Sequence, residues 1–172
     1  MSLRFGLTIM AAGVLLGTPA VPVFAEDAGP TTAELTARIA GGGTWAFETR
    51  DRMTNGKPVC TESWTFRADG TATIVSGEQT VEKTWRAEVD GDGLQWLYTT
   101  SIKATTGADC MGEVADPGDY PRPESGFVLL FFNAGNGITC QPPQWIEGPD
   151  GKPAQLWTDE GCWGSIVPKP KG

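Results

Sequence analysis

The chain has 172 residues, and the first limit on its chemistry is that none of them is histidine. This absence excludes a Ser-His-Asp triad, a Cys-His dyad and a histidine-ligated zinc or haem. The 21 acidic residues are numerous enough for a pair of catalytic carboxylates, but no spacing selects two of them. We therefore predict no catalytic residue, no cofactor and no enzymatic activity.

The cysteines are the second reactive group, and they stand far apart in the chain, at Cys60, Cys110, Cys140 and Cys162. No C-x-x-C pair is present, so the spacing typical of metal sites and of thioredoxin-like redox sites is missing. An even number of cysteines in an exported protein indicates two disulfides. Spacing alone leaves all three pairings open.

Clustered aspartates raise the question of calcium, at Asp90, Asp92, Asp116 and Asp119. The segment Asp90-Gly-Asp-Gly lacks the further ligands and the later glutamate of a calcium loop. Its glycines instead suit a tight hairpin turn, because glycine accepts a positive φ. We predict a turn here and no metal site.

Aromatic side chains at alternating positions are the strongest candidates for a binding surface. Alternation predicts that one inner face carries Trp45, Phe47, Trp64, Phe66, Trp85, Trp96 and Tyr98. This set either lines a pocket for an apolar ligand or fills the interior, because a barrel of eight strands is wide enough for both outcomes. Both readings stay open at this stage.

Two charged residues, Glu62 and Lys83, share that inner face. A charge on an apolar face is costly unless it is paired. The two side chains therefore anchor the head group of a ligand, or they lie at the rim and extend their charged ends into water.

The elements that must position these residues are mostly strands. One helix is predicted at Thr31–Ala40, where Thr31 and Glu34 have capping-box spacing and Leu35 and Ile39 share a face. Strands are predicted at Thr44–Arg50, Cys60–Arg67, Thr71–Ser76, Val81–Val89, Leu94–Lys103, Gly126–Asn133 and Ile138–Gln141, with a last hairpin of Gln144–Glu147 and Ala154–Thr158. Closely spaced turn signals between them indicate an antiparallel meander.

Turn lengths predict how the strands pair. A three-residue turn at Ala68–Gly70 and four-residue turns at Gly77–Thr80 and Asp90–Gly93 place apolar residues opposite one another on one face. The expected pairs are Phe66 with Ala72, Trp64 with Ile74, Ile74 with Lys83, Ala72 with Trp85, Trp85 with Tyr98, and Ala87 with Trp96. This agreement predicts an all-β fold, a single antiparallel meander that closes into a barrel of about eight strands with one short N-terminal helix.

The same order of strands selects one disulfide pairing. Cys60 begins a strand and Cys110 follows another at the same end of the meander, while Cys140 and Cys162 flank the last hairpin. We therefore expect Cys60–Cys110 and Cys140–Cys162.

The chain divides into four parts by composition. Residues 1–25 are predicted to be a secretory signal peptide, with Arg4, an apolar run and small residues before a cut after Ala25. Residues 26–42 are expected to form a leader and a short capping helix. Residues 43–165 are expected to form the barrel, and residues 166–172 a flexible tail. The expected protein is periplasmic or secreted. With a net charge of −8 we expect no nucleic-acid partner, and no membrane insertion after cleavage.

A short helix followed by Gly43-Thr44-Trp45 at the start of the first strand resembles the lipocalin-like (calycin) small barrels. In that family Gly-x-Trp lies at the closed end of the barrel, which the helix caps. The chain departs from the family in two respects, since it has no Thr-Asp-Tyr-like turn and no arginine after the last strand to stack on Trp45. Its architecture also resembles bacterial periplasmic protease inhibitors of the small-barrel type.

Two functional classes follow from these observations. The first is a non-enzymatic binding protein that holds a small apolar or amphipathic molecule in an aromatic-lined barrel. The second is an inhibitor or interaction protein that acts on a protein target, a protease or lysozyme, through the loops at 51–59 and 104–125.

Overall fold

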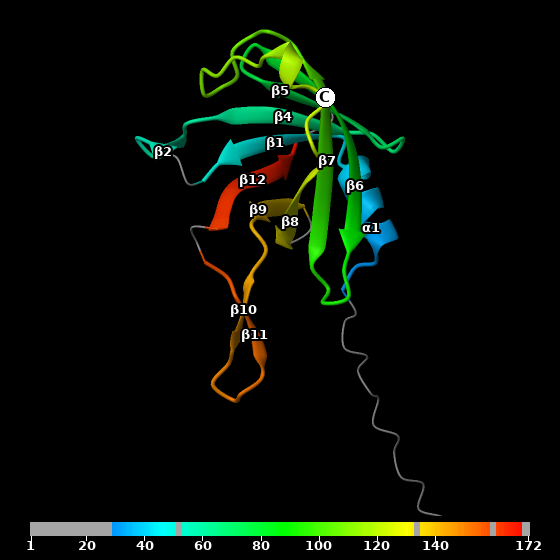
Figure 1. The fold of residues 1–172 in the computed structure, drawn as a ribbon, viewed down its shortest axis with the longest axis vertical. Helices are drawn as coiled ribbons and strands as arrows, with labels where there is room; N and C mark the ends of the chain where they lie inside the picture. The colour runs from blue at the N-terminus through cyan, green and yellow to red at the C-terminus, as the bar shows by residue number, and fades with distance from the viewer. Residues whose placement is uncertain (1–28, 51–52, 133–134, 159–160, 170–172) are drawn as a thin grey trace, which may run out of the picture.

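Residues 29–50, 53–132, 135–158 and 161–169 are described by a computed structural model, so the expected signal peptide lies outside the described residues. Within them, eight strands form a closed antiparallel barrel in the order β1-β12-β9-β8-β7-β6-β5-β4 (Figure 1). The barrel strands are β1 (Thr44–Thr49), β4 (Thr61–Phe66), β5 (Thr71–Ser76), β6 (Gln79–Val89), β7 (Gln95–Ala104), β8 (Ser125–Phe132), β9 (Asn136–Cys140) and β12 (Cys162–Pro168). The predicted fold class is therefore confirmed.

The strand that closes the barrel, β12, was not among the predicted strands. It pairs with β1 on one side and with β9 on the other. Residues 166–168 of the segment expected to be a flexible tail belong to this strand. Two features make β12 hard to predict from the sequence. Gly164 lies within it, and a bulge at Trp163 interrupts the alternation of inward and outward side chains. Gly164 is needed because the Phe47 ring lies where a β-carbon would stand.

One end of the barrel is closed by the helix α1 (Thr32–Gly41). Thr31 and Glu34 form the predicted capping box, and Leu35 and Ile39 are buried. The indole N–H of Trp45 donates to the carbonyl of Ile39 at 3.0 Å, which ties the first strand to the helix. The helix packs against β6 and β4 (Figure 1).

The register between β4 and β5 is as predicted, with Trp64 opposite Ile74 and Phe66 opposite Ala72. Between β5 and β6 the predicted register is wrong by two residues. The turn contains only Gly77 and Glu78, so Lys83 lies opposite Ala72 instead of Ile74. A shift of two residues leaves every side chain on its predicted face.

Between β6 and β7 the predicted register is wrong by one residue. Val89 pairs with Gln95 and the loop has five residues, so Trp85 lies opposite Thr99 and Ala87 opposite Leu97. A one-residue shift reverses the face of every side chain in a strand. Trp96 and Tyr98 therefore lie on the outer surface of the barrel, not inside it as predicted.

The Asp90 carboxylate gives the physical reason for this shift. One oxygen of Asp90 accepts the backbone N–H groups of Asp92 and Leu94, and the other accepts the indole N–H of Trp96 at 2.8 Å. These bonds hold a longer loop and keep the indole outside. Tyr98 stacks on Trp96, and its ring covers Gly126 of the neighbouring strand.

Two short hairpins stand outside the barrel. One consists of β2 (Met53–Thr54) and β3 (Lys57–Pro58). The other consists of β10 (Gln144–Glu147) and β11 (Pro153–Leu156), and it projects from the barrel wall as an arm (Figure 1). Among the described residues, no helix is long and apolar enough to cross a membrane.

Both predicted disulfides are present, Cys60–Cys110 and Cys140–Cys162. Cys60 precedes β4 and Cys110 follows β7, while Cys140 ends β9 and Cys162 begins β12. In this antiparallel order both bridges lie at the end of the barrel opposite the helix. We call this end the open end.

Candidate ligand-binding site

A cavity of about 360 Å³ occupies the open end of the barrel. Its apolar wall is built from Trp64, Phe66, Ile74, Val81, Phe127 and Trp163. Its polar residues include Glu62, Ser76, Gln79, Lys83, Thr99 and Ser125. A concave, mostly apolar space with a few polar groups is the usual form of a small-molecule site.

The aromatic wall is rigid because its rings pack on one another. Trp64 lies parallel to Phe47 with 4.6 Å between ring centroids, and its opposite edge contacts Phe127 at 6.1 Å. Trp163 contacts both Phe47 and Phe127, at 5.5 and 5.4 Å. The bulge at Trp163 is what aims this indole inward.

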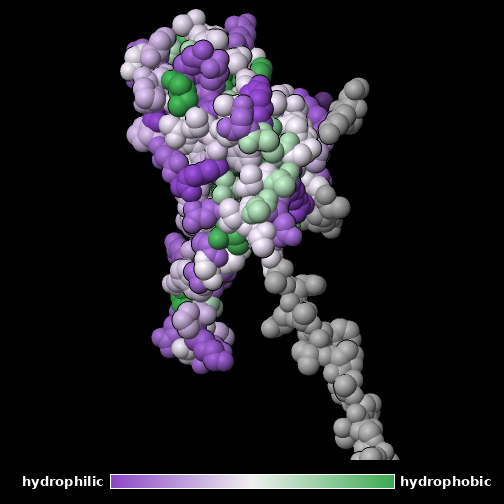
Figure 2. Space-filling view, turned by 90° about the vertical axis from the view of Figure 1, so that its right-hand side faces the viewer, coloured by the Kyte–Doolittle hydropathy of each residue, from purple (hydrophilic) through white to green (hydrophobic). Residues whose placement is uncertain are grey.

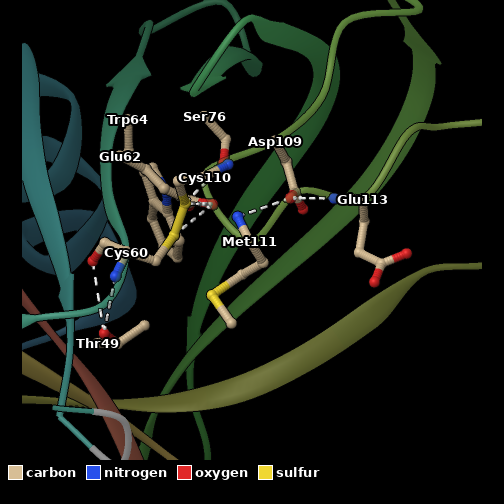
Figure 3. The surroundings of a disulfide bond; sticks show 9 residues. All are labelled: Thr49, Cys60, Glu62, Trp64, Ser76, Asp109, Cys110, Met111 and Glu113. Carbon is tan, nitrogen blue, oxygen red and sulfur yellow. Dashed lines mark hydrogen bonds between the residues drawn. A yellow bond between two sulfur atoms is a disulfide. The ribbon is translucent and has the colours of Figure 1, made fainter. Parts of the chain in front are cut away.

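Glu62 lies on the inner face of β4, as predicted, two residues before Trp64. Its carboxylate accepts the indole N–H of Trp64 at 2.5 Å (Figure 3). The other carboxylate oxygen lies 3.9 Å from the sulfur of Cys60 and 3.8 Å from that of Cys110. Both sulfurs are in a disulfide, so this group is not a thiolate metal site.

Lys83 also lies on the inner face, as predicted. Its ammonium group donates to the Ser101 hydroxyl at 2.7 Å. Among the described residues, no carboxylate lies within ion-pair distance of Lys83. Burial lowers the pKa of Lys83, the negative charge of Glu62 opposes this, and Arg122 adds to the lowering.

The loop between β7 and β8 covers part of the open end (Figure 1). Its attachment is dense, because Cys110 is bridged to Cys60 and its N–H donates to Ser76 at 3.1 Å. The side-chain amide of Gln79 donates to the carbonyl of Gly107 at 3.2 Å, within the same contact. The loop passes so close to Gly77 that a β-carbon there would meet backbone atoms at 2.8 Å.

The turn that carries Cys110 is shaped by Asp109, which lines the cavity. One oxygen of its carboxylate accepts the N–H groups of Met111 at 2.8 Å and of Glu113 at 2.9 Å (Figure 3). A 3-10 turn, η1 (Pro117–Asp119), follows further along this loop. Arg122 then joins the loop to the barrel wall, because its backbone N–H donates to the carbonyl of Ser101 at 2.9 Å.

The structure brings four of the predicted ligand-binding residues into this cavity, namely Glu62, Trp64, Phe66 and Lys83. Phe47 lies behind Trp64 and lines a second, shallower hollow of about 340 Å³. Trp45 and Trp85 are buried, and their indole N–H groups are used by carbonyls of Ile39 and Arg67. Trp96 and Tyr98 lie outside.

Sequence reasoning missed the polar inner face of β7 and the far wall of the cavity. Thr99 and Ser101 point inward, where Trp96 and Tyr98 were expected. Phe127 was expected only as part of the strand Gly126–Asn133, and Trp163 lay in a segment for which no strand was predicted. No alternation could assign Phe127 to the inner face, because residues 127–132 are apolar at odd and even positions alike.

Comparisons with known proteins identify no relative. No family model matches the chain, and it has no significant match among curated proteins or among solved structures. The closed barrel with a helix beside Trp45 is compatible with the lipocalin-like arrangement, but the likeness is one of architecture. Any function must therefore be argued from the cavity itself.

Proposed function

We propose that this chain is an exported, non-enzymatic binding protein that holds a small amphipathic molecule in the cavity at the open end. The observation that carries the proposal is the cavity, with an aromatic wall and a few polar groups inside a closed barrel. Two disulfides support an oxidising compartment, either the periplasm or the exterior. Aromatic rings give a ligand a large contact area with few rotatable bonds to immobilise.

The closed end supports the proposal because it leaves the open end free for binding. Around α1 the barrel is filled by Trp45, Phe66, Leu35 and Ile39, all nearly inaccessible to solvent. Stability can therefore come from that end. The open end can keep a space that a fully packed protein interior would not contain.

The test uses the protein purified without denaturant from the periplasm of a bacterial host. Native mass spectrometry is expected to show a co-purifying small molecule, or fluorescence titration to show that amphipathic probes change the emission of Trp64 and Trp163. Fatty acids and haem-like molecules serve as first probes. If the protein has its bare mass and no probe changes the emission, the binding proposal fails.

A second candidate, an interaction protein, is favoured by the arm formed by β10 and β11. This arm carries Trp145, Ile146 and Leu156, which are 52%, 43% and 41% exposed. Figure 2 shows the arm standing apart from the barrel, with hydrophobic residues among hydrophilic ones. Such exposed side chains are typical of a surface that contacts a protein.

An inhibition assay distinguishes this second candidate. Defined serine proteases and lysozyme are assayed with the native chain and with a Trp145→Ser, Ile146→Thr variant. Inhibition by the native chain that the variant loses supports an interaction protein. Equal activity of every enzyme with and without the chain argues against it.

A further inference from the structure

Resting on the proposed function, we infer that the cavity selects ligands with an anionic head group, which Lys83 binds while the aromatic wall holds the apolar body. The inference concerns the chemical class of the ligand. It depends on which hydrogen-bonding groups in the cavity already have partners and which do not.

Lys83 has donors to spare. An ammonium group has three N–H donors, and the hydrogen bond to Ser101 uses one of them. The side chain lies between Ala72 and Ser101 across the sheet, so its neighbours on the wall are small. A partly buried cation with no described carboxylate within ion-pair distance is stabilised when an anion enters the cavity.

The acids of the cavity are already engaged. The Glu62 carboxylate accepts the Trp64 indole N–H, and one oxygen of the Asp109 carboxylate accepts two backbone N–H groups. These bonds use part of the acceptor capacity that a cationic ligand would need. Arg122 lies close enough to lower the pKa of Lys83 by its charge, so it adds positive potential on the side of Lys83.

The apolar body has a defined place. Trp64, Phe127 and Trp163 form one continuous wall, with ring centroids 5.4 to 6.1 Å apart. The polar residues Lys83 and Thr99 come from the neighbouring strands β6 and β7. A molecule with one charged end and a flat apolar body satisfies both surfaces at once.

The experiment compares two fluorescent probes that share one aromatic body. The anion is 1-anilinonaphthalene-8-sulfonate, and the neutral partner is N-phenyl-1-naphthylamine. Each is titrated into the wild-type protein, Lys83→Gln and Glu62→Gln, with circular dichroism confirming that the variants are folded. Lys83→Gln is expected to weaken the sulfonate about tenfold or more, because a hydrogen bond to a charged group is lost. Glu62→Gln is expected to tighten it, because a repulsive charge is removed.

The neutral probe separates the two proposals. Its affinity is expected to change less than that of the sulfonate in Lys83→Gln, because a neutral probe forms no ion pair with Lys83. If wild type binds both probes and Lys83→Gln weakens neither or both equally, the anionic selectivity is overturned while ligand binding stands. If wild type binds neither probe and also shows its bare mass in native mass spectrometry, the proposed function fails as well. If Lys83→Gln is unfolded, Lys83→Arg serves in its place and must retain preference for the sulfonate.

Discussion

At the scale of single residues, Lys83 is the unusual feature of this barrel. An ammonium group within a barrel loses hydration, and that loss lowers its pKa. The hydrogen bond to Ser101 fixes its direction. This bond and the partial burial of the side chain support the proposed role of Lys83 as an anchor for an anionic head group.

The binding of an anionic probe should depend on pH through this group. As pH rises from neutral to about 10, Lys83 loses its proton earlier than an ordinary lysine because burial lowers its pKa, so the cation that attracts the sulfonate is lost. The affinity for 1-anilinonaphthalene-8-sulfonate is therefore expected to fall over this range. Fluorescence titrations at several pH values measure the effect. Lys83→Gln is the control, and an equal fall in that variant would contradict the assignment.

At the scale of elements, sequence reasoning succeeded where residue type and strand order determine structure and failed where a particular side-chain hydrogen bond sets the loop length. The capping box of α1, the turn after Phe66 and both disulfides followed from residue type and strand order. The face of β7 did not, because Asp90 lengthens the preceding loop by capturing the Trp96 indole. Nothing in the spacing of Asp90-Gly-Asp-Gly distinguishes a loop of four residues from one of five.

The candidate site was predicted in part for the same reason. Glu62, Trp64 and Lys83 lie on strands whose faces were predicted correctly, so they were found. Phe127 and Trp163 complete the cavity from β8 and β12, which are distant in the chain from that meander. A pattern read along one strand cannot show which later strand closes a barrel.

The loop that Asp90 organises should be sensitive to that one carboxylate. Asp90→Ala removes the acceptor of two backbone N–H groups and of the Trp96 indole, and it is expected to destabilise the fold by about 1–3 kcal/mol. Urea unfolding measures this loss of stability.

The same carboxylate should make stability depend on pH. Partial burial raises the pKa of Asp90, but its hydrogen bonds outweigh that effect, so the pKa is lowered. Their contribution should therefore be lost in wild type as pH falls through the folded-state pKa. Asp92→Ala is the matched control, and an equal loss of stability would contradict this role.

The disulfide Cys60–Cys110 at the open end tests how the loop between β7 and β8 is held in place. Cys60–Cys110 closes a segment with a sequence separation of 50 residues, and Cys140–Cys162 one of 22. Replacing the first pair with serine is expected to cost about 2–4 kcal/mol and to speed amide hydrogen exchange in residues 107–113. Replacing Cys140 and Cys162 with serine is the control, since this disulfide does not attach the loop between β7 and β8. Unchanged exchange in 107–113 without Cys60–Cys110 would show that other contacts hold the loop.

At the scale of the whole molecule, the two ends of the barrel differ in how tightly they are packed. The closed end is packed by α1 and large apolar side chains, with Leu35 and Ile39 almost fully buried. The open end holds the cavity, both disulfides and the charged residues. This separation lets the interior keep a cavity without losing the core that stabilises the barrel.

The division predicts that stability and binding can be changed separately. Ile39→Ala removes a side chain that is 0% exposed between the helix and the barrel, and it is expected to cost about 2–5 kcal/mol. Because Ile39 does not line the cavity, the affinity of the folded variant for N-phenyl-1-naphthylamine should stay close to the wild-type value. Phe127→Leu is the reverse case, since it takes part of the aromatic wall from the cavity and should weaken that probe more than it weakens the fold. Urea unfolding and probe titration on both variants give the four numbers. If Ile39→Ala lowered affinity as much as Phe127→Leu, the two ends would be one cooperative unit, and the cavity would depend on the same packing as the core.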